Sequence, residues 1–166
     1  MNMKNQDFTT TISVDQTPQE AFNAIKNVRG WWSENIEGRT DQLGSEFEYH
    51  YKDVHRCKMK IIELIPEQKM VWLVTDNYFN FTKDKSEWID TKVIFEIIPQ
   101  NDKTEIRFTH QGLVPQYECY PVCNEAWSHY IHDSLQSLIA TGKGQPIPKD
   151  EEGSFETQQV EKWKLK

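Results

Sequence analysis

His110 is the residue of this sequence whose type and position could best support acid–base chemistry. It alternates with Phe108 in a segment, residues 104–110, that predicts a β-strand, so its imidazole should lie on the inner face. A free imidazole titrates near pH ~6.5 and could act as a general base or anchor a ligand. A histidine at such a position can equally be a structural group with satisfied hydrogen bonds. No other catalytic residue is predicted, and the sequence favours a protein that is not an enzyme.

Cysteine and histidine spacing raises the possibility of a metal or redox site. Cys119 and Cys123 are four residues apart and share one face of a predicted helix. His129 and His132 follow in the same helix but point elsewhere around it, so one tetrahedral site would require a bend. Small apolar packing is the favoured role of the cysteines. We therefore expect no metal and no cofactor.

Aromatic residues are unusually frequent and offer a second kind of chemistry, the binding of an apolar molecule. The chain has six Trp, six Tyr and eight Phe, together 12% of its residues. Such rings either fill a core or line a pocket, where the polar tips of Tyr and Trp orient a ligand. The predicted ligand-binding cavity is lined by Trp31, Trp32, Tyr49, Tyr51, Phe95, Phe108, His110, Trp127 and Tyr130.

The periodicity of apolar residues predicts the elements that position these side chains. Alternation predicts strands, and Thr17, Pro18 and Glu20 form a helix start signal after the first of them. A long helix with period 3.6, spanning roughly 30 Å, follows the last strand and ends before Gly142. The expected strands are 8–14, 45–51, 56–61, 70–75, 88–98 and 104–110, with one or two short helices after the first, a loop at 76–85 and a helix from 120.

This order of elements predicts an α+β domain. A curved six-stranded antiparallel sheet should wrap around the long C-terminal helix and leave a cavity between them. We expect one domain over residues 1–142 and a polar, partly mobile C-terminal tail over residues 143–166. His50 and His55 are expected to face solvent or a turn.

Composition and charge limit the classes of partner that the protein can bind. The 166 residues carry 19 basic and 26 acidic side chains, a net charge of −7, which disfavours nucleic acid and anionic membrane surfaces. Mean hydropathy is −0.76, and no apolar run approaches the ~20 residues of a membrane-spanning helix. Residues 1–11 lack the apolar core of a signal peptide, and the three cysteines do not suggest a disulfide framework. We expect a cytoplasmic protein, monomeric or homodimeric, without membrane insertion.

Two segments resemble a known superfamily. The strand followed by VDQTPQEAFNAI at residues 14–25 and then Trp31-Trp32 is similar to the opening of the SRPBCC helix-grip superfamily, which includes START domains and the major birch pollen allergen. The closing helix, from Ala126-Trp127-Ser128 to Thr141-Gly142-Lys143-Gly144, resembles the subgroup related to the C-terminal domain of the activator of the ninety-kilodalton heat-shock protein ATPase. The resemblance covers roughly residues 8–145 and implies the helix-grip fold.

Three functions follow as hypotheses. The leading one is a protein that holds a hydrophobic or amphipathic small molecule between sheet and helix. The resemblance implies two alternatives: a stress-related, co-chaperone-like module that contacts a heat-shock chaperone, and a cyclase- or hydrolase-like enzyme with His110 as general base. The superfamily hosts all of these, so the fold alone does not choose among them.

Overall fold

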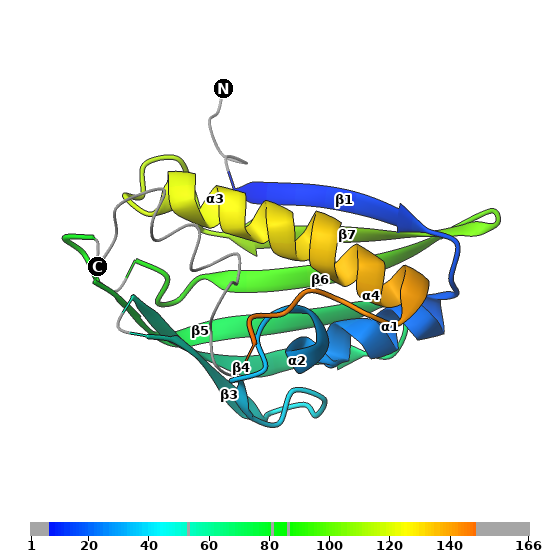
Figure 1. Cartoon of the computed structure of the whole chain (residues 1–166), viewed down its shortest axis with the longest axis horizontal. Coiled ribbons are helices and arrows are strands. Elements are labelled where there is room, and N and C mark those ends of the chain that lie inside the picture. The colour runs from blue at the N-terminus through cyan, green and yellow to red at the C-terminus, as the bar shows by residue number, and fades with distance from the viewer. Residues whose placement is uncertain (1–6, 53, 81, 86, 149–166) are drawn as a thin grey trace.

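The fold is a single antiparallel sheet that packs against a long C-terminal helix and two shorter helices. The computed structural model describes residues 7–148 except 53, 81 and 86 (Figure 1). Its strands are β1 (Phe8–Val14), β2 (Glu37–Gly38), β3 (Glu46–Tyr51), β4 (His55–Ile65), β5 (Lys69–Phe79), β6 (Lys92–Gln100) and β7 (Lys103–Gln111). Its helices are α1 (Pro18–Lys26), α2 (Val28–Trp31) and a continuous C-terminal helix made of α3 (Tyr120–Ser128), η1 (His129–Leu135) and α4 (Gln136–Thr141). No helix of the described residues has both the length and the apolar character needed to cross a bilayer.

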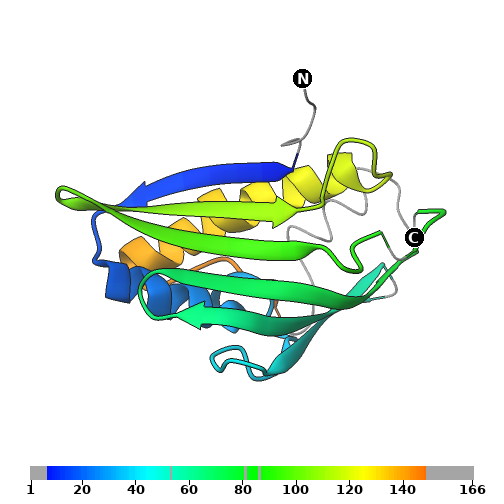
Figure 2. The ribbon, with the colours of Figure 1, turned by 180° about the vertical axis from the view of Figure 1, so that it is seen from behind.

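All strands join one antiparallel sheet in the order β1-β7-β6-β5-β4-β3-β2. The helices cover one face, and Figure 2 shows the opposite face without them. The α+β helix-grip prediction is therefore confirmed, but the predicted number of six strands is wrong. The seventh, β2, pairs Glu37 with Glu48 and Gly38 with Phe47. Two residues are too few to produce a readable alternation, and the sequence shows only turn-like glycines there.

The predicted start of α1 is confirmed atom by atom. Thr17 Oγ1 accepts a hydrogen bond from the amide of Glu20 at 3.1 Å, and Glu20 Oε1 accepts one from the amide of Thr17 at 2.9 Å. This reciprocal pair satisfies two amide groups that the first turn of a helix leaves open. The helix then buries Ala21, Phe22 and Ile25 against the sheet.

Three predicted boundaries in the middle of the sheet are wrong. β4 does not end at residue 61 but continues to Ile65. β5 does not end at Thr75 but continues to Phe79, since Asp76 pairs with Lys58 and Phe79 with His55. The next strand begins at Lys92 rather than at Trp88, because Trp88 lies in a turn closed by a hydrogen bond from the amide of Thr91 to the Trp88 carbonyl. The long β4–β5 ribbon also carries two register shifts, which bend strands and increase twist.

The C-terminal helix contains a wide turn that the sequence does not predict. Across His129–Leu135 the backbone forms a π-helix, in which the amide of Gln136 donates to the carbonyl of Ile131, five residues earlier. Buried residues recur every four positions along the whole helix: Cys123, Trp127, Ile131, Leu135 and Ile139. A four-residue step overshoots one α-helical turn by about 40°. The looser π segment compensates for this drift and keeps the row facing the sheet.

The segment after the helix is anchored to α2. Residues 143–147, here called the C-terminal strap, follow Gly142, which closes the helix with φ 86° as predicted. Ile147 is buried, its amide donates to the carbonyl of Trp32, and its carbonyl accepts from the amide of Glu34, both at 2.9 Å. The first part of the predicted tail is therefore part of the folded domain, and residues 149–166 lie outside the described residues.

Candidate functional site

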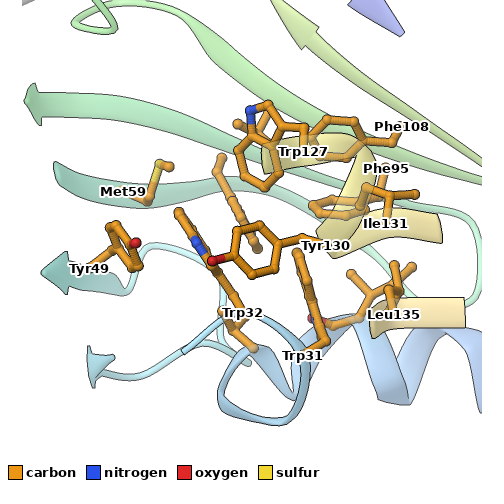
Figure 3. Packing of buried hydrophobic residues seen from close by; sticks show 14 of the residues in the cluster. Trp31, Trp32, Tyr49, Met59, Phe95, Phe108, Trp127, Tyr130, Ile131 and Leu135 are labelled. Carbon is orange, nitrogen blue, oxygen red and sulfur yellow. The ribbon is translucent and has the colours of Figure 1, made fainter. Parts of the chain in front are cut away.

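The aromatic residues meet in one cluster beneath the C-terminal helix. Trp32 lies parallel to Tyr49, with ring centroids 4.4 Å apart, and parallel to Trp72 at 6.1 Å. Tyr130 extends from the helix toward Trp32 and Tyr49 (Figure 3). All nine predicted cavity residues are buried, and ring-to-ring contacts fill most of the space between them. The interior is thus mainly a packed core.

One small cavity remains between the sheet and α3. Its volume is about 30 Å³, enough for a water molecule and far below the ~300–1,000 Å³ of sites for drug-sized ligands. Three of the nine predicted residues line it: Trp32, Trp127 and Tyr130. The cavity lining does not include Trp31, Tyr49, Tyr51, Phe95, Phe108 and His110.

Most of the lining comes from residues that the sequence did not indicate. They are Val54, His55, Phe79, Trp88, Val122, Cys123 and Ala126. They come from the start of β4, the end of β5, the turn before β6 and the first half of the C-terminal helix. A wider depression of about 520 Å³ exists between the β4–β5 turn and the end of β6, but exposed turn residues such as Pro66 and Glu67 form it. The candidate site is the smaller cavity under α3, because buried side chains line most of it.

His110 is committed to a chain of hydrogen bonds. The indole Nε1 of Trp127 can only donate, and it lies 3.0 Å from Nδ1 of His110. The neutral ring must therefore carry its proton on Nε2, which donates to Thr91 Oγ1 at 2.8 Å. The Thr91 hydroxyl in turn donates to the Trp88 carbonyl. Because both ring nitrogens are engaged, the geometry favours the structural role of His110 over that of a general base.

Burial keeps His110 neutral. Desolvation lowers its pKa to about 3, with the neighbouring His55 as a second, smaller cause. An imidazole with this pKa does not collect a proton at neutral pH. The Trp127–His110–Thr91 chain is thus a neutral connection between helix, last strand and turn.

His55 was expected to face solvent or a turn, and this prediction is wrong. It is only 8% exposed and stacks on Phe79 with ring centroids 4.4 Å apart. Its Nε2 lies 3.0 Å from Oδ1 of Asn77, and burial lowers its pKa to about 3, although the Asn77 hydrogen bond partly opposes this. His50, by contrast, is exposed as predicted.

Trp88 forms the wall between His55 and the helix. Its ring lies edge-on to His55, with centroids 4.7 Å apart at 87°, and parallel to Trp127 at 5.9 Å. Only 3% of the residue is exposed, and its Nε1 finds no acceptor among the residues that the structure describes. A buried donor without a partner is rare and costly.

A carboxylate fastens the turn at Trp88 to the start of the C-terminal helix. Glu87 accepts from the amide of Glu118 at 2.8 Å and from the amide of Cys119 at 3.1 Å. Glu118 in turn accepts from the amide of Lys83 at 2.6 Å. These bonds satisfy open amides at the helix start and hold one side of the cavity closed.

The cysteine and histidine residues of the helix do not converge. His132 bonds Thr10 at 2.6 Å and His129 bonds Asp133 at 3.2 Å, while Cys119 and Cys123 are buried thiols that form no disulfide within the described residues. Within residues 7–148, as far as they are described, no group of three His, Cys, Asp or Glu side chains could hold a metal ion.

Fold and site together define a helix-grip α+β domain, a long helix on a curved antiparallel sheet with an apolar cavity between them. Residues 5–140 match the family described as Activator of Hsp90 ATPase homolog 1-like protein, and the chain belongs to this family, within the SRPBCC superfamily. The resemblance read from the sequence is thereby confirmed.

Solved structures show the same fold at low sequence identity. The Aha1 dimer from Colwellia psychrerythraea, solved in solution, superposes with a TM-score of 0.67 at 21% identity, over 83% of this chain and 98% of that one. Protein MLL2253 from Mesorhizobium loti gives 0.62 at 14% identity, over 80% and 96% of the two chains. Protein SSP2350 from Staphylococcus saprophyticus gives 0.60 at 16%, over 83% and 94%. No curated protein matches the sequence.

Proposed function

We propose that this protein binds a small, largely apolar molecule in the cavity between α3 and the His55–Phe79 end of the β4–β5 ribbon. The observation that carries the proposal is this cavity itself, walled by aromatic rings and aliphatic side chains within an otherwise filled interior. Apolar walls contribute affinity in proportion to the surface they remove from water, about 25 cal/mol per Å².

The size of the cavity sets a condition on binding. At about 30 Å³ it admits a ligand of more than a few atoms only if a wall moves. Val122 and Ala126 are half-buried helix residues on that wall, and the turn at Trp88 lies opposite them. Displacement of the helix start from this turn would enlarge the cavity without disturbing the ring stack around Trp32.

The first experiment is native mass spectrometry of the freshly purified protein, followed by organic extraction. A stoichiometric bound mass would support the proposal and reveal the chemical class. Titration of ¹⁵N-labelled protein with toluene supplies a defined apolar probe. We expect the indole signals of Trp88 and Trp127 to shift. A bare protein that also ignores toluene would overturn the proposal.

Two matched variants locate the binding. Ala126→Leu should fill the cavity and abolish the toluene shifts. Ala140→Leu adds the same side chain to an exposed position of the same helix and should leave them unchanged. Equal toluene binding by both variants would exclude this cavity.

Family membership favours a second candidate, docking on an Hsp90-type chaperone through the outer surface. The test is calorimetric titration with the chaperone's middle domain. Binding that persists in Ala126→Leu would assign that interaction to the surface rather than to the cavity.

A further inference from the structure

We propose that the cavity recognises a hydroxyl group on an otherwise apolar, uncharged molecule, with Trp88 Nε1 donating to the hydroxyl oxygen and His55 Nδ1 accepting its proton. This inference rests on the proposed function and specifies the ligand class of the same site.

The donor is the indole N–H of Trp88. Three other buried tryptophans are paired: Nε1 of Trp31 donates to the Ile25 carbonyl, that of Trp72 to Met70 Sδ and that of Trp127 to His110. Trp88 lines the cavity, and its Nε1 is buried and has no acceptor in the described part of the chain. A ligand oxygen can supply the missing acceptor.

The acceptor follows from the orientation of Asn77. Its Nδ2 donates to the carbonyl of Lys85 at 3.1 Å, so the other atom of the amide, Oδ1, must face His55. Because Oδ1 only accepts, His55 Nε2 carries the ring proton. Nδ1 is then a bare lone pair, since the side-chain hydrogen bond of His55 in the described part of the chain is made by Nε2. Since burial holds the pKa of His55 at about 3, this tautomer persists at neutral pH.

The two groups belong to rings in direct contact. His55 and Trp88 meet edge to face at 4.7 Å, and neighbouring rings fix both: Phe79 stacks on His55, and His110 lies at 4.7 Å from Trp88. Both rings are therefore held in place before a ligand arrives, which reduces the ordering cost of binding.

A hydroxyl group meets both requirements with one oxygen atom. An ether accepts from Trp88 but offers no proton to His55. A carboxylate likewise offers no proton to His55. It would also bring a negative charge into a cavity whose lining has no cationic partner, because both histidines nearby are neutral. Water carries the same two functions, and a hydroxyl that displaces it keeps both hydrogen bonds.

The test compares four ligands of one shape on the full chain: phenol, anisole, toluene and benzoate. Affinities come from NMR titration, with the Trp88 indole signal as reporter, assigned with Trp88→Phe. We expect phenol to bind about ten-fold more tightly than anisole, the equivalent of one added hydrogen bond, and about a hundred-fold more tightly than toluene, the equivalent of two, and benzoate not to bind. The Trp88 N–H signal should move downfield with phenol and not with toluene.

Equal affinities for phenol, anisole and toluene would overturn the hydroxyl preference and leave the proposed function standing. Failure of all four ligands would overturn both.

Matched histidine variants assign the acceptor. His55→Phe keeps a ring against Phe79 and removes Nδ1, so the preference for phenol over anisole should disappear. His50→Phe makes the same change at an exposed site of β3 and should keep it. If His55→Phe does not fold, as judged by circular dichroism, Trp88→Phe tests the donor side with the Trp127 indole signal as reporter: the preference for anisole over toluene should disappear, and that for phenol over anisole should remain. A preference that survives in the folded variant expected to lose it would overturn the assignment.

Discussion

Trp127 donates a 3.0 Å hydrogen bond to Nδ1 of His110 and thereby joins the middle of the C-terminal helix to the last strand of the sheet. The bond fixes the tautomer of His110, whose Nε2–H donates to the Thr91 hydroxyl, and this hydroxyl donates to the Trp88 carbonyl. The residue with the most evident catalytic chemistry in the sequence therefore holds the fold together at the place where the cavity forms.

Two replacements of Trp127 should distinguish the contributions of its packing and of its hydrogen bond to the free energy of unfolding. Trp127→Phe removes the donor and leaves His110 Nδ1 buried without a partner, which should lower the free energy of unfolding by about 1–3 kcal/mol. Trp127→Ala also opens a large void and should cost about 3–5 kcal/mol. Urea unfolding followed by circular dichroism measures both, and a Trp127→Phe variant as stable as the wild type would contradict the role of the bond.

Mild acid should destabilise the protein through its two buried histidines. His55 and His110 have pKa values of about 3 in the fold, against about 6.5 in an unfolded chain. Between these values the unfolded state binds more protons, so stability is complete above pH ~6.5 and falls as the pH decreases below it, by about 1.4 kcal/mol per pH unit for each histidine.

Urea unfolding at pH 7.5, 6.5 and 5.5 would measure this slope. The variant His55→Phe should show about half of it, whereas His50→Phe, changed at an exposed site, should show all of it. A free energy of unfolding that stays constant from pH 6.5 to 5.5 would refute the neutral burial of both rings.

Glu87 should stabilise the start of the C-terminal helix. Glu87→Ala leaves the amides of Glu118 and Cys119 without their acceptor, and we expect a loss of about 1–3 kcal/mol. Amide hydrogen exchange should accelerate in the first turns of α3 and not in α4. Glu46→Ala, at an exposed acid of β3, is the control, and equal exchange in the two variants would show that the carboxylate does not hold the helix.

Gly112 should be more sensitive to substitution than another glycine of similar backbone geometry. At φ 101° an added Cβ would lie 2.7 Å from Cγ2 of Thr91, the partner of His110, whereas Gly44 at φ 85° has open space around it. Gly44→Ala should cost about 1–2 kcal/mol from backbone strain alone. Gly112→Ala should cost a further ~1–3 kcal/mol from the clash. Thermal unfolding of the pair checks this, and equal costs would mean that Thr91 moves aside freely.

The strands and helices with regular periodicity could be predicted from the sequence. Alternation places β1, β3 and β7 to within a residue, and the capping pair at Thr17 places α1. The end of β5 could not be predicted, because Asp76 and Asn77 interrupt the apolar pattern. Both continue the strand through pairing with β4, a long-range contact that local sequence does not encode.

The site was harder to predict than the fold. Trp32, Trp127 and Tyr130 have the aromatic character expected of a cavity lining. His55 is buried by Phe79, its partner on the neighbouring strand, together with Tyr49 and Trp88, and local sequence does not encode these contacts. Trp88 was assigned to a strand, and its place in a turn depends on the Thr91 hydroxyl and amide. The aromatic composition correctly indicated a cluster of rings beneath the helix. The remaining space depends on how tightly the rings pack against one another. Amino-acid composition does not predict this packing.

The π-helical turn in the C-terminal helix has a consequence for how the length of this chain can vary. A turn closed by bonds to the fifth residue holds one residue more than an α-helical turn, so loss of one exposed residue there, such as Asp133, converts it to regular α-helix. After this deletion the buried residues on both sides of the turn, up to Trp127 and from Ile139, would still face the sheet. The same deletion inside α3 would rotate everything after it by about 100° and turn the buried row toward solvent. In alignments of related chains, single-residue insertions and deletions in this helix should therefore occur mostly at the π-helical turn, because the helix keeps its packing on the sheet there.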